Sequence, residues 1–256
     1  MSKEKLFFID EHGCAKNQVD AELISTNLLL EGWKRTDFAE DASLIIINSC
    51  GFINRAKEES LNSLFQARSM YPDAKIVLAG CLAERYAKDF EKELSEADCI
   101  FGNGDISKIG EVVNSLFSKS CSKKTNIFPQ EGISNGERLE FLNLPGSAFI
   151  KITEGCDNIC SFCAIPLIRG HLRSRPIEEI VEEISYLNKA GMFEFNLIGQ
   201  DLATYGLGST DLGFGNASFV RGSSGSMNLN GEKSPLYNLL SAISAIEGDF
   251  WIRLLY

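Results

Sequence analysis

The sequence has few histidines and no long hydrophobic run. Only His12 and His171 are histidines among its 256 residues, so a zinc site of the mixed Cys/His type has few candidate ligands. No apolar stretch approaches the roughly 20 residues of a membrane-spanning helix. The first ten residues lack a signal-peptide pattern, because their short apolar stretch is followed by charge. We therefore expect a cytoplasmic protein without a membrane segment.

Basic residues are also outnumbered. The chain has 25 Lys and Arg against 35 Asp and Glu, which gives a net charge of −10. An acidic surface repels phosphate backbones and suits a basic protein partner better than bare nucleic acid. With 44% hydrophobic residues the chain can form a sizeable core, and its length fits one or two domains.

The first half of the chain alternates between strand-like and helix-like segments. Asn17 and Asp105 are expected to cap the first and last of these helices. Such alternation predicts a doubly wound parallel sheet with helices on both faces, over residues 1–118. The expected strands are 6–10, 44–48, 75–79 and 99–101, and the expected helices are 19–31, 56–70, 84–94 and 106–116.

A connector rich in Ser, Lys, Asn and Gly follows at 119–145. Alternation then resumes over 146–256, which predicts the first part of a (β/α) barrel. Three strand–helix units cannot close a barrel, so we expect a fragment of a longer protein. The stretch 206–234 is long for a loop, and we expect it to be functional or mobile. The strands are expected at 149–152, 195–198 and 250–255, with helices between Pro176 and Gly191 and at 236–246.

The strongest motif is C-x3-C-x2-C, formed by Cys156, Cys160 and Cys163 directly after an expected strand. Three thiolates can hold three irons of a cubane cluster and leave the fourth iron open to an amino acid's amine and carboxylate. The alternative is a zinc site with a distant fourth ligand. Phe162 is either a core residue or an aromatic ring positioned to pack on the adenine of S-adenosylmethionine (SAM).

Cys14, Cys50 and Cys81 are too far apart in sequence for a local motif, but each follows an expected parallel strand. The carboxyl ends of such strands meet at one edge, where ligands bind. The three thiols can therefore converge as ligands, or they can be small buried hydrophobic residues. Cys99, inside a strand, and Cys121, in the connector, are expected to be non-ligands.

Other polar residues are weaker candidates. Gln200 and Asp201 end an expected strand, so they either face a ligand or cap the structure. Arg169, Arg173 and Arg175 either clamp a carboxylate or partner, or form a solvated basic patch.

Taken together, these motifs resemble the methylthiotransferase family of radical SAM enzymes. The resemblance covers most of the chain, although His12 stands where a small apolar or leucine-like residue is expected. Its matching segments are 13–22 (GCAKNQVDAE), 48–53 (NSCGFI), 80–85 (GCLAER), 154–163 (EGCDNICSFC), 169–170 (RG), 173–176 (RSRP) and 197–201 (LIGQD).

The resemblance implies two [4Fe-4S] clusters and SAM as cofactors. Cys156, Cys160 and Cys163 would hold the cluster that binds and reduces SAM, with Phe162, Gln200 and Asp201 as cofactor-binding candidates. Cys14, Cys50 and Cys81 would hold an auxiliary cluster that keeps or delivers sulfur. No catalytic side chain is assigned. The implied partners are a flavodoxin-like reductant and an unidentified sulfur donor, and a monomer is expected.

Two branches of this family differ in substrate. One modifies a tRNA adenosine, and its first motif usually reads GCQMN. The other adds a methylthio group to the β-carbon of an aspartate in small-subunit ribosomal protein twelve, and it resembles this chain at 14–20, 50–53, 56–60 and 248–256. We favour the second branch. The alternatives are the tRNA reaction and a non-enzymatic iron–sulfur carrier.

Overall fold

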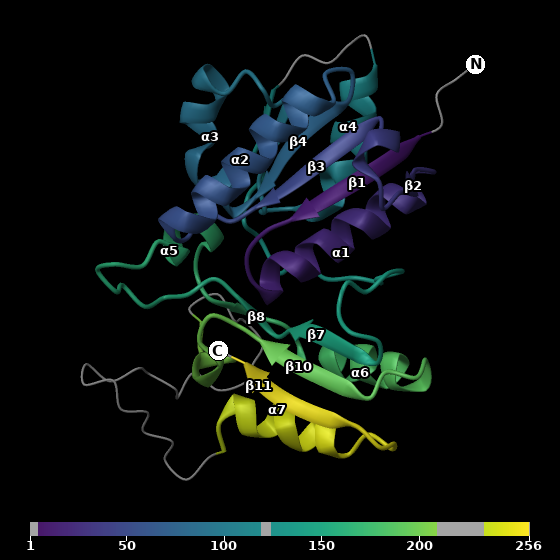
Figure 1. The fold of residues 1–256 in the computed structure, drawn as a ribbon. Coiled ribbons are helices and arrows are strands. Elements are labelled where there is room, and N and C mark those ends of the chain that lie inside the picture. Colours follow the sequence, from purple (N-terminus) through teal and green to yellow (C-terminus); the bar gives the residue numbers. More distant parts are fainter. Residues whose placement is uncertain (1–4, 119–123, 209–232, 256) are drawn as a thin grey trace. The chain divides into compact units, whose positions relative to one another are not determined.

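The computed structural model describes residues 5–118, 124–208 and 233–255, which divide into two units (Figure 1). The first unit consists of Met1–Leu142 together with Cys160–Arg169, and the second of Asn143–Ile159 and Gly170–Tyr256. Cys121 and most of the expected loop 206–234 lie outside the described residues.

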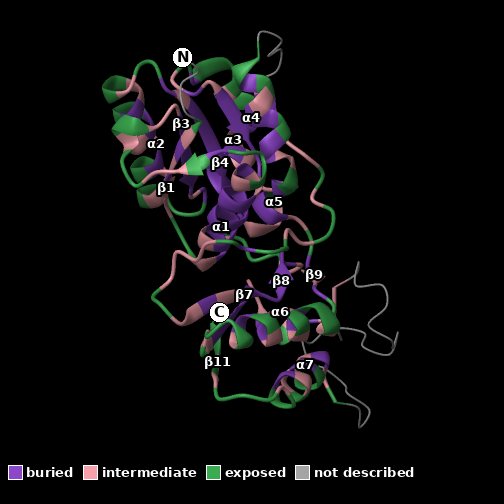
Figure 2. Ribbon diagram, turned by 90° about the vertical axis from the view of Figure 1, so that its right-hand side faces the viewer, coloured by how far each residue is buried: buried purple, intermediate pink, exposed green. Residues whose placement is uncertain are grey.

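The first unit is built on a sheet of six strands, all paired in parallel. The central strands are the most apolar, and β3 is buried along its whole length (Figure 2). This sheet confirms the predicted α/β class. Its order is β2 (Lys34–Arg35), β1 (Leu6–Glu11), β3 (Leu44–Ser49), β4 (Lys75–Gly80), β5 (Cys99–Phe101) and β6 (Thr125–Asn126).

Helices cover both faces of this sheet. On one face α2 (Asn54–Met70) and α3 (Cys81–Glu93) pack on side chains of β3, β4 and β5. On the other, α1 (Ala15–Leu30) contacts α4 (Ile109–Phe117). The predicted cap Asp105 precedes a short 3-10 turn, Ile106–Lys108, and accepts a hydrogen bond from the N–H of Ser107. A second such turn spans Ala39–Asp41.

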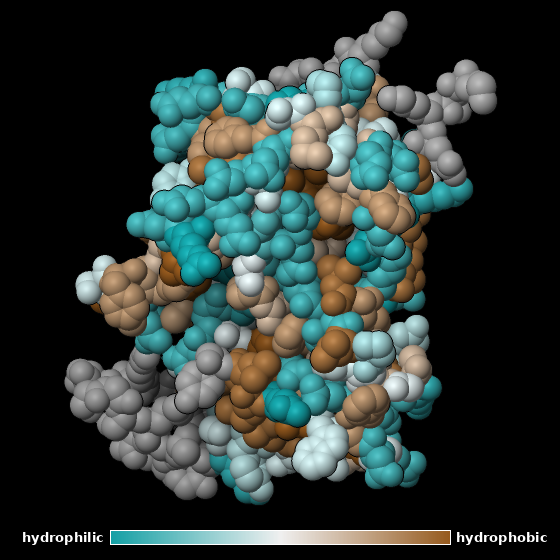
Figure 3. Space-filling view, in the orientation of Figure 1, coloured by the Kyte–Doolittle hydropathy of each residue, from teal (hydrophilic) through white to brown (hydrophobic). Residues whose placement is uncertain are grey.

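The outer surfaces of α2 and α3 are polar, and hydrophilic side chains predominate over these helices in Figure 3. Only a narrow stripe of each helix therefore contributes to the core. Among the described residues no helix combines the length and hydrophobicity needed to cross a membrane.

Helix α1 departs from its predicted form. It begins at Ala15, with Cys14 at the N-cap position, so the prediction of Asn17 as the cap is wrong. The Asn17 amide instead donates to the backbone carbonyls of His12 and Ser49. The helix is also buried on its polar side, where Asp20 and other charged or polar residues are enclosed (Figure 2).

The segment after β6 encloses that polar side of α1. Arg138 and Glu22 form an ion pair at 2.7 Å, and both side chains are almost inaccessible to solvent. The N–H of Leu142 also donates to Glu22, and that of Leu139 donates to Thr26. The segment expected to be a connector is therefore bonded along α1 in the first unit.

The second unit has a sheet of three parallel strands in the order β11 (Trp251–Leu255), β10 (Glu194–Ile198), β7 (Ser147–Lys151). Its helices α6 and α7 contact each other, as expected for crossover helices on one face of a parallel sheet. The remaining elements are the antiparallel pair β8 (Thr153–Glu154) and β9 (Arg173–Ser174), the 3-10 turn Leu202–Thr204, α6 (Ile177–Lys189) and α7 (Pro235–Ser244).

The buried Arg138–Glu22 pair gives a first prediction. Replacing Arg138 by Met leaves the Glu22 carboxylate buried without its guanidinium partner, which typically costs 3–5 kcal/mol, on the order of half the stability of a domain. We expect R138M to lower the free energy of unfolding of the first unit by about 4 kcal/mol in urea titrations.

The matched control is Arg35, which also bonds the connector. It pairs with Glu140 at 3.2 Å, but both side chains are partly exposed, so R35M should cost at most about 1 kcal/mol. Equal losses in R138M and R35M would contradict the assignment. The double variant E22M/R138M should recover most of the loss, because it removes both buried charges.

Asp98 gives a second prediction, on pH dependence. It precedes β5 and bonds Arg68, Lys75 and the N–H of Ile76. Burial raises the pKa of Asp98, but the bonds from Ile76, Lys75 and Arg68 outweigh it and the net pKa lies below the usual value of 3.8.

A carboxylate with a lowered pKa in the folded state stabilises the fold above its unfolded pKa. That contribution disappears as the pH falls through the lower, folded pKa. We expect D98N to cost about 1–3 kcal/mol of unfolding free energy at pH 7, and the difference from the parent to shrink below about pH 4. Denaturant titrations from pH 3 to 7 measure it, and a pH-independent difference would refute the prediction.

Candidate metal centres

The structure places three cysteines at one edge of the six-stranded sheet. Cys14 caps α1 a few residues after β1, Cys50 directly follows β3, and Cys81 is the first residue of α3 after β4. The parallel register aligns Glu11 with Asn48 and Ser49 with Gly80, so these strand ends lie together.

Close backbone approaches bring the three segments into contact. A Cβ on Gly13 would lie 3.1 Å from the Cβ of Cys50, and a Cβ on Gly51 would lie 2.6 Å from the carbonyl oxygen of Cys81. Glycine at position 51 therefore permits a spacing that no side chain allows. No disulfide joins the described cysteines; Cys14 is exposed, Cys50 half-buried and Cys81 buried.

Asn17 connects the three cysteine segments. Its Nδ2 donates to the carbonyl of His12 at 2.9 Å and to that of Ser49 at 3.0 Å. Its Oδ1 accepts from the thiol of Cys81 at 3.3 Å. One buried amide thus links the segment before Cys14, the segment before Cys50 and Cys81 itself. Sequence analysis missed this role because it assigned Asn17 to a helix cap.

A buried arginine reaches the same place. Nη2 of Arg169, the last residue of α5 (Ile165–Arg169), lies 3.1 Å from the sulfur of Cys81. It also donates to Asn17 Oδ1 at 2.8 Å and to Asp20 Oδ2 at 2.9 Å. Burial raises the pKa of the Cys81 thiol to about 11, and the Arg169 charge and hydrogen bond act in the opposite direction.

The C-x3-C-x2-C cysteines fall in both units. Cys160 and Cys163 belong to the first unit, where the N–H of Cys163 donates to the carbonyl of Cys160 and closes a turn. Cys156 belongs to the second unit and is buried. The N–H of Cys156 donates to the carbonyl of Gly170, and that of Asn158 donates to the Cys156 sulfur at 3.4 Å.

Gly155 makes the turn before Cys156 possible. Its φ of +75° lies in the left-handed region, and a Cβ there would lie 2.0 Å from the carbonyl oxygen of His171. Any side chain at position 155 would displace this loop. In the same part of the second unit, His171 Nδ1 lies 2.9 Å from the Asp157 carboxylate.

The three cofactor-binding candidates have different surroundings. Phe162 is 85% exposed, so its ring is not part of the core of the first unit. In the second unit, Oε1 of Gln200 is buried and has no hydrogen-bond partner among the described residues. Asp201 accepts a hydrogen bond from the amide of Asn158 at 2.9 Å, which fastens the loop after Cys156.

The three arginines considered for a clamp have separate roles. Arg169 bonds Cys81 in the first unit. Arg175 is buried in the second unit and donates to the Lys151 carbonyl and to Glu183. Arg173 donates to the carbonyl of His171. Arg169 and Arg175 are buried, so neither belongs to a solvated basic patch.

His12, at a position where we expected a small apolar or leucine-like residue, has a largely buried side chain. Its Nε2 lies 3.3 Å from the Asp10 carboxylate. The contact with Asp10 raises the pKa of His12 and lowers that of Asp10, against the effect of burial on each.

The donor chemistry fits a cluster better than a single ion. Within the described residues, no three Cys, His, Asp or Glu side chains are arranged to hold one metal ion. A single zinc requires all its thiolates at about 2.3 Å from one point, whereas an iron–sulfur cluster distributes its cysteine ligands over several irons. Cys14, Cys50 and Cys81 follow three neighbouring strand ends, a spread that is compatible with the second requirement.

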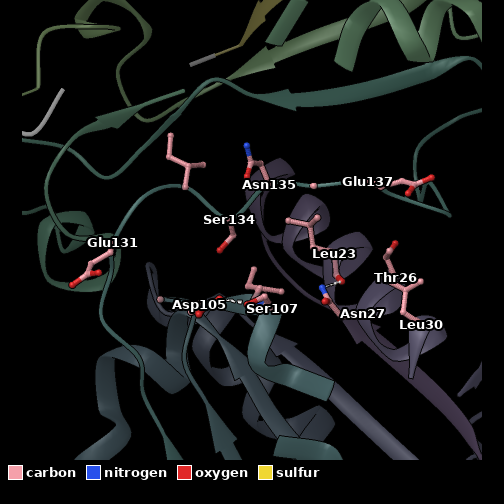
Figure 4. A pocket seen from close by; sticks show the side chains of 14 residues that line it. Leu23, Thr26, Asn27, Leu30, Asp105, Ser107, Glu131, Ser134, Asn135 and Glu137 are labelled. Carbon is pink, nitrogen blue, oxygen red and sulfur yellow. Dashed lines mark hydrogen bonds between the residues drawn. The ribbon is translucent and has the colours of Figure 1, made fainter. Parts of the chain in front are cut away.

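A separate cavity of about 320 Å³ lies between α1 and the connector (Figure 4). Leu23 and Asn27 of α1 line one side, and Ser134 and Asn135 line the other. Glu131 and Glu137 also border it, but no cysteine does. The cavity is therefore distinct from the edge where Cys14, Cys50 and Cys81 meet.

Two family models match the chain. Residues 6–102 match the family described as uncharacterized protein family UPF0004, and residues 150–212 match the radical SAM superfamily. The first match contains Cys14, Cys50 and Cys81, and the second contains Cys156, Cys160 and Cys163.

Several curated relatives carry the same name. The chain is 53% identical over 254 residues to the ribosomal protein uS12 methylthiotransferase RimO of Treponema denticola, a match that covers 97% of this chain and 52% of the relative. It is 37% identical to the RimO of Acetivibrio thermocellus, over 95% of this chain and 51% of the relative. The chain thus spans about half the length of these relatives.

A solved structure shares the fold. The radical SAM methyltransferase TsrM of Kitasatospora setae, with cobalamin and a [4Fe-4S] cluster bound, aligns with a TM-score of 0.50 at 11% identity. The alignment covers 78% of this chain and 49% of that one. At this identity the likeness concerns the fold alone.

Proposed function

The chain belongs to the radical SAM methylthiotransferase family, and from this premise we propose that the protein adds a methylthio group to the β-carbon of an aspartate in small-subunit ribosomal protein uS12. The observation that carries the proposal is the meeting of Cys14, Cys50 and Cys81 at one sheet edge, in a chain that also has the C-x3-C-x2-C loop. The identity with uS12 methylthiotransferases supports the choice of substrate.

In this proposal each cysteine set holds one [4Fe-4S] cluster. Cys156, Cys160 and Cys163 ligate the cluster that binds SAM, and Cys14, Cys50 and Cys81 ligate the auxiliary cluster. When bound, these groups supply a radical that removes hydrogen from the aspartate β-carbon, the sulfur that replaces it and the methyl group that completes the product. The protein's part would be to hold each cluster through its three cysteines and to orient the reacting groups.

The chain's own residues have separable tasks. The unpartnered Oε1 of Gln200 is available to accept a hydrogen bond from SAM. The exposed ring of Phe162 can pack on its adenine. Asp201, through Asn158, fixes the loop that carries Cys156. No residue is assigned to proton transfer.

The proposal divides the chain into an auxiliary-cluster domain (1–118), a connector (119–145) and a radical SAM domain (146–256). It places the protein in the cytoplasm as a monomer, with a flavodoxin-like protein as reductant. The net charge of −10 attracts a basic ribosomal protein at long range, and this attraction falls as salt rises.

Metal content tests the ligand assignment. Anaerobically reconstituted protein should contain about eight irons, if both clusters are four-iron cubanes. Replacing Cys156, Cys160 and Cys163 by Ala should halve that number, because only the auxiliary cluster remains. Iron analysis with protein quantitation measures it. The control C99A/C121A should keep the full content, and an unchanged content in the triple variant would refute the SAM-cluster assignment.

The substrate is tested in cells that lack the gene. Mass spectrometry of uS12 from these cells should show the loss of one methylthio group, and re-expression should restore it. Modified tRNA adenosines from the same cells serve as the control and should be unchanged. Intact uS12 modification together with undermodified tRNA would instead establish the tRNA reaction.

A further inference from the structure

Three acceptors share the two N–H groups of one Arg169 nitrogen in the first unit. This nitrogen, Nη2, donates to Asn17 Oδ1, Asp20 Oδ2 and Cys81 Sγ at 2.8, 2.9 and 3.1 Å. The side chains of Arg169 and Asp20 are 2% and 3% exposed. This cation therefore acts in a region that water scarcely reaches, where its interactions are much stronger than at a surface.

The helix that carries Arg169 is fixed against Cys81. Ala164 and Ile168 pack with Cys81 in one buried cluster. The carbonyl of Ile168 accepts a hydrogen bond from Gln130 at 2.6 Å. The guanidinium is thus held next to the sulfur by its own helix and by Asp20, and its position does not depend on a flexible side chain alone.

The segment has a second feature. Arg169 follows Cys163 by six positions, and Cys160–Arg169 belongs to the first unit although the flanking residues belong to the second. The segment that carries two cysteines of the C-x3-C-x2-C motif therefore also supplies the hydrogen-bond donor to a cysteine of the other set.

The charge state of Cys81 decides how much its contact with the Arg169 guanidinium contributes. Burying a guanidinium costs several kcal/mol unless negative charge compensates it, and the Asp20 carboxylate supplies one such charge at 2.9 Å. A neutral Cys81 thiol adds little to this pair, because sulfur in that state is a weak acceptor. A thiolate that ligates a cluster carries negative charge and accepts strong, charge-assisted hydrogen bonds. The contact with Cys81 is therefore worth most when that sulfur is a ligand.

We propose that Arg169 is a positioning residue of the auxiliary cluster, which donates a hydrogen bond to the ligating sulfur of Cys81 and stabilises the reduced form of the cluster. The inference rests on the proposed function only in taking Cys81 as a cluster ligand. Reduction adds one negative charge to a cluster, and hydrogen bonds to its sulfurs favour that state and raise the reduction potential.

The test uses full-length protein in which Cys156, Cys160 and Cys163 are replaced by Ala, so that only the auxiliary cluster is observed. In this background R169M and R169K are compared with R55M. Arg55 is an exposed residue of the same unit, close in sequence to Cys50, and R55M removes the same charge without touching the Cys81 sulfur. Iron content and the reduction potential from an EPR-monitored titration are measured.

We expect R169M to shift the auxiliary cluster to a lower reduction potential than the parent. R169K, which keeps a donor but not the planar fork, should show a smaller shift. R55M should match the parent in iron content and potential. Loss of iron from R169M with an unchanged circular dichroism spectrum, and its recovery in R169K, would also support the proposal.

Three results would overturn the proposal for Arg169. A cluster in R169M with the parent's potential would overturn the proposal, as would equal shifts in R169M and R55M. Unfolding of both Arg169 variants would make this residue a part of the fold only and would also overturn it. None of these readouts requires uS12, so the inference and the substrate assignment can fail independently.

Discussion

The parallel register of β1, β3 and β4 is the constraint on which the metal-binding region depends. Because Glu11 pairs with Asn48 and Ser49 with Gly80, the segments that follow these strands leave the sheet at one edge. β3 is buried on both faces, so apolar burial alone would tolerate a shift of one residue. Such a shift would, however, break the hydrogen bonds that the buried side chains of Asn48 and Ser49 donate to the carbonyls of Asn17 and Ala79. The bonds that fix this register therefore also fix where Cys14, Cys50 and Cys81 meet.

Helix α1 turns that edge into a polar centre. Most helices at a sheet face bury apolar residues and expose polar ones, but α1 buries Asn17, Asp20 and Glu22 as well. Each of these has a specific partner outside the helix, in the segment before Cys50, in α5 or in the connector. A buried polar group is stable only when its hydrogen bonds are made, so these partners explain why the polar side of α1 is tolerated inside the protein.

Sequence patterns predicted the strands well and the polar contacts poorly. Apolar runs such as Leu44–Ser49 identify buried strands because hydrophobic burial is local information. The start of α1 and the role of Asn17 were missed, since both depend on carbonyls far away in the chain. The Glu22–Arg138 and Arg169–Cys81 contacts join residues 116 and 88 positions apart, and no periodicity reports such pairs. The sequence pointed to the role of Asn17 only through its position, three residues after Cys14 in a segment that follows a buried strand.

The contacts of Asn17 and Arg169 also order the segments that carry Cys14, Cys50 and Cys81. In small zinc domains the metal supplies the folding energy, and the ligands are unstructured without it. Here the sheet, Asn17 and Arg169 hold the three cysteine segments by hydrogen bonds and packing within the first unit. These contacts contribute to ordering the three cysteines, as supporting residues do around a preorganised site. A ligating Cys81 sulfur carries negative charge in a region of low dielectric. The buried guanidinium of Arg169 stabilises that charge.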